Sequence, residues 1–171
     1  MKVYGVIGWK NSGKTGLMER LIAEIRARGL SVSSIKHAHH AFDIDQPGKD
    51  SFRHRQAGAG EVLLASARRW VLMHENENEE EPPLAALLAR LSPVDLVLVE
   101  GYKRDAHPKI EAHRAATGQP LIAPDDPTVR AVASETVQGL AAMGWQGAAF
   151  DLNDAAGIAD FILSDLGFRA T

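Results

Sequence analysis

The sequence predicts an α/β fold in three layers, with a mainly parallel sheet flanked by helices. Short apolar runs alternate with segments of helical spacing, and the run at 96–99 is apolar at every position, as in a strand buried on both faces. Strands that alternate with helices are joined by right-handed crossovers, which make successive strands parallel. We expect the 171 residues to form a single domain, residues 1–171, large enough to bury a core.

The expected strands span 3–7, 30–36, 61–65, 70–74, 95–99, 109–113, 129–133 and 148–150. The expected helices span 14–29, 50–57, 84–91 and 154–166, with Gly29 ending the first and Asp50 capping the second. Segments 37–49 and 75–83 are predicted to be loops, because they are rich in polar and charged residues and contain prolines.

The composition excludes several classes of protein and site. Cysteine is absent, which excludes disulfides, thiolate metal sites and a cysteine nucleophile. The net charge of -3 provides no basic field for nucleic acid or an anionic membrane. No apolar run approaches the roughly 20 residues of a membrane span, and the apolar start is interrupted too early for a signal segment. We therefore expect a cytoplasmic protein that binds neither nucleic acid nor membrane.

Residues 8–15 form the most specific motif of the chain. Their sequence, Gly8-Trp9-Lys10-Asn11-Ser12-Gly13-Lys14-Thr15, fits G-x-x-x-x-G-K-[ST] at every defined position. The glycines let successive N–H groups point at phosphate oxygens, Lys14 reaches the β and γ phosphates, and the Thr15 hydroxyl can ligate Mg²⁺. A strand before and a helix after the loop complete the pattern. The motif predicts the three-layer P-loop NTPase fold, with all eight residues at the nucleotide.

A P-loop requires a carboxylate that holds Mg²⁺, usually at the end of a neighbouring apolar strand. Glu100 follows such a strand, where it emerges at the carboxyl edge of the sheet. A glutamate that merely ends a strand in solvent is the alternative, but beside a P-loop we favour Glu100 as a catalytic, magnesium-holding residue. Asp50 is a second candidate for the same role, whereas Asp95 begins its strand and belongs to the opposite edge.

The segment 36–51 combines basic, histidine and aspartate residues. His37, His39 and His40 could ligate a transition metal, hydrogen-bond a phosphate or a pterin-like ring, or belong to a solvated loop, and the pattern leaves these open. Lys36 and Lys103 each follow or end a strand on the P-loop edge and are candidates for phosphate contact. A phosphorylated second ligand would explain the similarly placed Arg104 and Arg114, but for each of them taken singly we favour solvated surface.

Together these residues resemble the molybdopterin-guanine dinucleotide biosynthesis protein B (MobB) family. The resemblance covers most of the first two thirds of the chain. It is carried by Gly8–Thr15, Lys36-His37, His40, Phe42-Asp43-Ile44-Asp45, Pro47-Gly48-Lys49-Asp50-Ser51, Arg53, Ala57-Gly58-Ala59, Val99-Glu100-Gly101-Tyr102-Lys103 and Pro108-Lys109-Ile110-Glu111. The chain departs from the family pattern at Ala38, where an acidic residue is common, and at Gly16, where a second threonine is common.

The resemblance implies a cytoplasmic, homodimeric GTP-binding protein with weak GTPase activity. Such a protein assists a MobA-like guanylyltransferase in attaching GMP to molybdopterin, which is itself a candidate ligand. Mg²⁺ is implied near Thr15, Asp50 and Glu100. Guanine preference comes from the resemblance alone, since the chain lacks the Asn-Lys-x-Asp sequence that reads guanine in many GTPases. The segment 129–135 is proposed, as a guess, to lie near the base.

Two other classes use the same P-loop. A metallochaperone GTPase would carry nickel or zinc on His37, His39 and His40, although no cysteine pair accompanies them. A small-molecule kinase or ligase would show rapid phosphoryl transfer to an acceptor. Slow hydrolysis is expected in the accessory role, because no water-positioning residue or built-in arginine finger stands out. Arg53 or Arg55 could supply such an arginine across a dimer interface.

Overall fold

The computed structural model describes residues 1–38, 43–76 and 80–168, and the chain divides into two compact units. The first unit comprises residues 1–37 and 90–171, and the second comprises residues 38–89. The prediction of a single domain over 1–171 stays a prediction, because a compact unit need not fold on its own. Each unit is described separately below.

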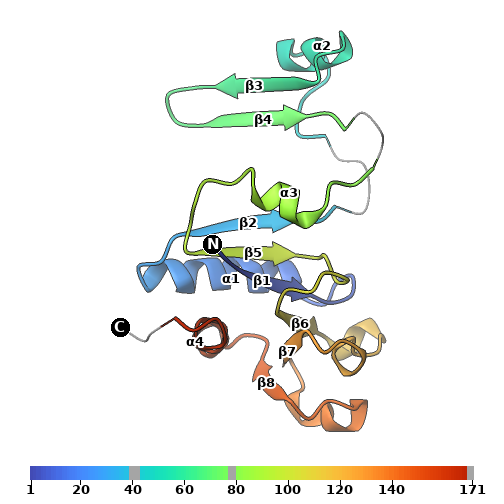
Figure 1. The fold of residues 1–171 in the computed structure, drawn as a ribbon. Helices are drawn as coiled ribbons and strands as arrows, with labels where there is room; N and C mark the ends of the chain where they lie inside the picture. Colours follow the sequence, from blue (N-terminus) through green and yellow to red (C-terminus); the bar gives the residue numbers. More distant parts are fainter. Residues whose placement is uncertain (39–42, 77–79, 169–171) are drawn as a thin grey trace. The chain divides into compact units, whose positions relative to one another are not determined.

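The first unit is built on a parallel sheet with the strand order β2-β5-β1-β6-β7-β8 (Figure 1). The strands are β1 (Lys2–Ile7), β2 (Val32–Lys36), β5 (Leu96–Glu100), β6 (Lys109–His113), β7 (Val129–Ser134) and β8 (Ala148–Asp151). Since the strands are parallel, their carboxyl ends meet at one edge, the edge at which ligands bind in open α/β sheets. The predicted fold class is confirmed.

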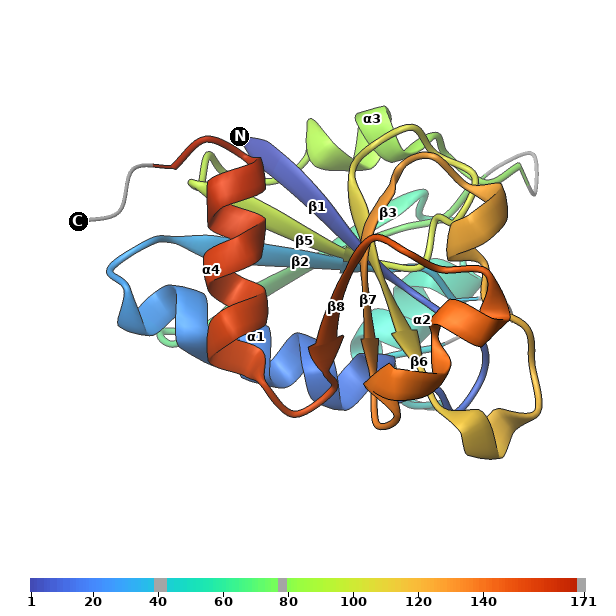
Figure 2. The ribbon, with the colours of Figure 1, turned by 90° about the horizontal axis from the view of Figure 1, so that it is seen from below.

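Two α-helices cover one face of this sheet. These helices, α1 (Lys14–Ala27) and α4 (Ala155–Asp165), lie side by side (Figure 2). Leu17, Leu21 and Ile25 of α1 recur at helical spacing and are fully buried against the strands, as are Ile158 and Ile162 of α4. Burial of each such side chain contributes about 1.5–3 kcal/mol, so this core holds the sheet and α1 in a fixed relation.

The opposite face of the sheet has a smaller core made by short 3₁₀ turns. The turns are η1 (Ala115–Thr117), η2 (Ala123–Asp125), η3 (Val137–Gly139) and η4 (Ala141–Met143). Leu121, Ala123 and Leu140 bury themselves against Ile7 and Val132 of the strands. Hydrophobic periodicity did not predict these turns, because a three-residue helix is too short to show a repeat in the sequence.

The second unit contains an antiparallel hairpin and two short helices. The hairpin pairs β3 (Glu61–Ala65) with β4 (Trp70–His74), and the helices are α2 (Asp50–Gln56) and α3 (Leu84–Leu88). The two strands were expected from their apolar runs, but they form a separate sheet instead of joining the parallel one. The four-residue connection at 66–69 explains their antiparallel pairing with each other, since a parallel crossover requires a dozen or more residues.

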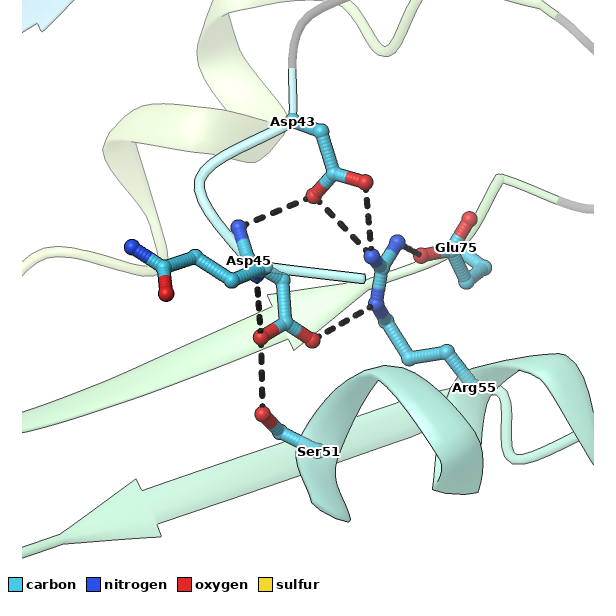
Figure 3. Close-up of polar contacts among 6 residues, drawn as sticks. Asp43, Asp45, Ser51, Arg55 and Glu75 are labelled. Atoms are coloured by element: carbon cyan, nitrogen blue, oxygen red, sulfur yellow. Dashed lines mark hydrogen bonds and ion pairs between the residues drawn. The ribbon is translucent and has the colours of Figure 1, made fainter. Parts of the chain in front are cut away.

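Arg55 organises the polar side of the second unit. Its guanidinium pairs with Asp43 at 2.9 Å, Asp45 at 3.4 Å and Glu75 at 2.8 Å, and Asp45 also accepts a hydrogen bond from the Ser51 hydroxyl (Figure 3). The hydrogen bonds that Arg55 donates to Glu75 and Asp43 raise the pKa of its guanidinium. Because its donors are engaged inside this unit, Arg55 ties segment 43–45 to α2 and β4, which disfavours it as an arginine finger.

Candidate functional site

The loop between β1 and α1 has the backbone of a phosphate cradle. Gly8 has a φ of 142°, and a Cβ at this position would lie 2.3 Å from the carbonyl oxygen of Ala112 on β6. Gly13, at the N-cap of α1, has a φ of 94°. Both positions therefore require glycine. The loop turns between them with Asn11 left-handed at a φ of 65° and leads directly into the N-terminus of α1, the end of a helix that favours anions.

Lys14 and Lys103 bring two ammonium groups to the loop. The Lys14 Nζ donates to the carbonyl oxygen of Trp9 at 2.6 Å, and the Lys103 Nζ lies 4.2 Å from the centre of the Trp9 ring. Burial lowers the pKa of both lysines, while Glu100 opposes the shift at Lys14 and Glu111 opposes it at Lys103. The positive charges of Lys103 and Lys36 also lower the pKa of Lys14. A bound phosphate would offset the positive charge of these lysines, so the arrangement favours an anionic ligand.

Glu100 ends β5 and faces the loop, as predicted. Its Oε1 accepts a hydrogen bond from the Thr15 hydroxyl at 3.4 Å and lies 3.7 Å from the Lys36 Nζ. The Glu100 side chain is only 12% exposed, in contrast to the plain strand-end glutamate that was the alternative. Since β2 and β1 both pair with β5, the fold places Lys36 and Thr15 on either side of this carboxylate. A hydroxyl and a carboxylate are the hard oxygen ligands that suit Mg²⁺.

An open pocket of about 430 Å³ lies over the loop and is lined by residues 11–16 and Arg114. Its volume falls in the range of roughly 300–1,000 Å³ typical of small-molecule sites. Arg114, for which solvated surface was the favoured interpretation, is 41% exposed and also borders this pocket, where a Cβ on Gly13 would lie 3.3 Å from the Arg114 Nε. The available signal was its place directly after strand β6, at the carboxyl edge of the sheet.

A buried carboxylate supports the loop from below. Glu111 is fully buried on β6 and accepts hydrogen bonds from the backbone N–H groups of Ile122 and Ala123 at 2.8–3.0 Å. In the same segment, residues 120–123, the carbonyl oxygen of Pro120 accepts a hydrogen bond from the indole N–H of Trp9 at 2.8 Å. Burial raises the pKa of Glu111, and the two N–H groups oppose this shift. In the sequence, Glu111 could be singled out only through the family resemblance, because its contacts are with residues that do not adjoin it in the chain.

Asp50 and the histidines at 37, 39 and 40 were the other candidates for the site. Asp50 begins α2 in the second unit and is its first helical residue, not its cap; Lys49 holds the N-cap position. Its predicted roles in catalysis and magnesium binding stay predictions. His39 and His40 lie outside the described residues, while His37 stacks on Tyr102 with ring centres 4.8 Å apart. Within 1–38, 43–76 and 80–168, no group of three His, Cys, Asp or Glu side chains could hold a metal ion.

Comparison with known proteins now decides the family. Residues 3–135 match the family described as MobB, "Molybdopterin guanine dinucleotide synthesis protein B". The chain belongs to this family. The "Molybdopterin-guanine dinucleotide biosynthesis adapter protein" of Escherichia coli (strain K12) is 42% identical over 158 residues, which cover 91% of this chain and 87% of that protein. The identically named protein of Haemophilus influenzae is 44% identical over 117 residues, covering 68% of this chain and 66% of that protein.

Solved structures agree with this membership. A crystal structure of Bacillus subtilis MobB aligns with a TM-score of 0.74 at 25% identity, covering 99% of this chain and 100% of that chain. The MobB resemblance predicted from the motifs is thus confirmed. In addition, no helix among the described residues has the length and apolar character needed to cross a membrane.

Proposed function

We propose that this MobB-family chain is a GTP-binding accessory protein of molybdenum cofactor maturation that assists a MobA-like guanylyltransferase in molybdopterin guanine dinucleotide synthesis. The accessory role agrees with the family and with the adapter proteins that the chain resembles. The observation that carries the nucleotide part is the P-loop, in which Lys14 and Thr15 begin α1 and the Glu100 carboxylate accepts a hydrogen bond from the Thr15 hydroxyl. The comparisons favour this role over a metallochaperone, kinase or ligase.

The loop and its neighbours would contact a bound triphosphate in different ways. Backbone N–H groups of 11–16 would bind the phosphate oxygens, and Lys14, Lys36 and Lys103 would neutralise their charge. The Thr15 hydroxyl and the Glu100 carboxylate would hold Mg²⁺, directly or through water, and Asp50 is the further carboxylate proposed for this ion. Mg²⁺ would offset charge between the β and γ phosphates. We expect hydrolysis to be slow, in keeping with an accessory role.

A homodimer is part of this proposal, and the hairpin of the second unit supports it. Leu63, Leu64, Trp70, Val71 and Leu72 are 37–66% exposed along β3 and β4. An isolated two-stranded sheet is marginally stable in water, and unpaired edges with apolar side chains favour association. We therefore expect a dimer in analytical ultracentrifugation at micromolar concentration. A monomer under these conditions would contradict the dimer without affecting nucleotide binding.

The direct test is calorimetric titration with non-hydrolysable GTP and ATP analogues, each with and without Mg²⁺. We expect GTP to bind more tightly than ATP, and Mg²⁺ to strengthen binding. Lys14→Ala should weaken GTP binding at least about tenfold, because it removes charge-assisted hydrogen bonds to phosphate, while the melting temperature stays near that of the wild type. Wild-type affinity in Lys14→Ala would contradict the cradle, and preference for ATP would favour the kinase or ligase class.

The partner is tested by reconstitution. A MobA-like guanylyltransferase supplied with GTP and molybdopterin should form more guanine dinucleotide when the chain is added. The Lys14→Ala variant should lose this stimulation. An equal yield with and without the chain would contradict the accessory role while leaving nucleotide binding intact.

A further inference from the structure

Arg114 and Glu135 form a charge pair that the proposed binding of phosphate and magnesium does not use. Arg114 directly follows β6 and Glu135 directly follows β7. These two strands are parallel neighbours, so both residues lie at the carboxyl edge of the sheet. The Arg114 Nε lies 3.0 Å from the Glu135 Oε1, and the two side chains are 41% and 46% exposed, which leaves both accessible to a ligand.

The strand order separates this pair from the magnesium side of the loop. In the order β2-β5-β1-β6-β7-β8, Lys36 and Glu100 lie on one side of β1, and Arg114 and Glu135 lie on the other. Arg114 lines the same pocket as residues 11–16. If the terminal phosphates and Mg²⁺ occupy the side of Glu100, the nucleoside of the same molecule extends toward the carboxyl ends of β6 and β7, where this pair lies.

Both side chains are carried by backbone that is held in place. Ser134 is fully buried; its hydroxyl accepts from the backbone N–H of Thr136 at 3.2 Å and lies 3.1 Å from the Nδ1 of His113. The carbonyl oxygen of Arg114 accepts from the backbone N–H of Thr117 at 3.0 Å and from its hydroxyl at 2.8 Å. Binding groups on fixed backbone lose little entropy when a ligand arrives, so the pair is suited to discriminate between ligands.

We propose that Arg114 and Glu135 recognise the base of the nucleotide as guanine, an inference that rests on the nucleotide binding proposed above. Guanine offers O6 and N7 as acceptors on its Hoogsteen edge, and N1–H and N2–H₂ as donors on the adjoining Watson–Crick edge. The guanidinium of Arg114 only donates and matches the first group, whereas the carboxylate of Glu135 only accepts and matches the second. Adenine offers an acceptor at N1 in place of the donor, and this acceptor would face the carboxylate unpaired. The pair thus replaces the missing Asn-Lys-x-Asp sequence.

The test is competition of GTP, ITP, XTP and ATP against a fluorescent GTP analogue in the presence of Mg²⁺. ITP lacks the 2-amino group, and XTP carries an oxygen in its place. The wild type should bind GTP about 10- to 100-fold more tightly than ITP and XTP, since a charge-assisted hydrogen bond is lost. Glu135→Gln should weaken GTP about 10- to 100-fold and strengthen XTP, because the amide N–H₂ can donate to the xanthine oxygen.

Arg114→Gln provides a complementary result. It should weaken GTP and ITP by the same factor, because both carry O6 and N7, and should leave the ratio of their affinities unchanged. The matched control is Asp125→Asn, which makes the same charge change as Glu135→Gln at an exposed position of η2. This control should retain the wild-type order of all four nucleotides. If Glu135→Gln unfolds, Glu135→Asp keeps the carboxylate and should retain the preference for GTP over XTP.

The outcomes separate this inference from the proposal beneath it. Tight GTP binding that Lys14→Ala abolishes, with unchanged GTP, ITP and XTP ratios in Glu135→Gln, overturns base recognition by this pair and leaves the phosphate cradle standing. A wild type that binds none of the four nucleotides overturns both. Inverted discrimination between GTP and XTP in Glu135→Gln, absent from the Asp125→Asn control, supports the assignment.

Discussion

Replacement of Glu111 by alanine tests how the structure supports the P-loop. The carboxylate accepts hydrogen bonds from the backbone N–H groups of Ile122 and Ala123, and the chain just before them holds Trp9 of the loop through Pro120. Glu111→Ala leaves the buried N–H group of Ala123 and the part-buried N–H group of Ile122 without their acceptor. Each such group costs about 1–3 kcal/mol, so the variant should lose about 2–6 kcal/mol of unfolding free energy.

The measurement is urea denaturation together with a thermal melt. A loss of this size corresponds to a drop in melting temperature of roughly 5–20 °C for a chain of this length. Glu111→Gln keeps one oxygen acceptor and should lose about half as much. Glu19→Ala is the control, since Glu19 is exposed on α1 and its removal should change stability by no more than about 0.5 kcal/mol.

Two results would refute the reasoning about Glu111. A loss in Glu111→Ala that matches the Glu19→Ala control would show that the segment at 122–123 does not depend on this carboxylate. Normal GTP affinity in a folded Glu111→Ala protein would show that support of Trp9 is unimportant for the cradle. We expect instead that GTP binding weakens in the variant at temperatures where it remains folded.

Three other perturbations should have distinct outcomes. Burial lowers the pKa of His107 and His113, so below about pH 6.5 the unfolded chain binds protons that the folded chain does not. The free energy of unfolding should therefore fall with pH in this range, by up to ~1.4 kcal/mol per histidine per pH unit. Urea titrations at several pH values measure this slope, and His113→Gln should reduce it. Arg55→Ala removes the carboxylate pairing of the second unit and should speed hydrogen exchange in 43–75 with little change in β1 and β5; uniform exchange would contradict its local role. Gly8→Ala forces a Cβ against the main chain of β6 and should abolish GTP binding, whereas Gly29→Ala, with open space around it, should bind GTP normally; equal binding by both variants would contradict the crowding argument.

The elements themselves were largely predictable. The apolar runs located the strands of both units, in most cases within two residues, because a buried strand must present apolar side chains to its neighbours. The predicted end of α1 at Gly29 was two residues too late. The helix ends at Ala27 with Arg28 as its C-cap, and Gly29 follows with a φ of 82°. Pairing was not predictable, and the hairpin of β3 and β4 forms its own sheet.

The candidate site was predictable in part for the same reason. Gly8–Thr15 is contiguous in the chain, so the cradle and its glycine requirements are visible in the sequence alone, and so is membership of the MobB family. Which residues meet the cradle depends on strand order, since Glu100 approaches through β5 and Arg114 through β6. Long-range packing selects that order, and it also joins Arg114 to Glu135 and Glu111 to Ile122. The sequence by itself therefore determined the P-loop, and only the tertiary structure decided what surrounds it, because a local motif encodes its own backbone but not its neighbours.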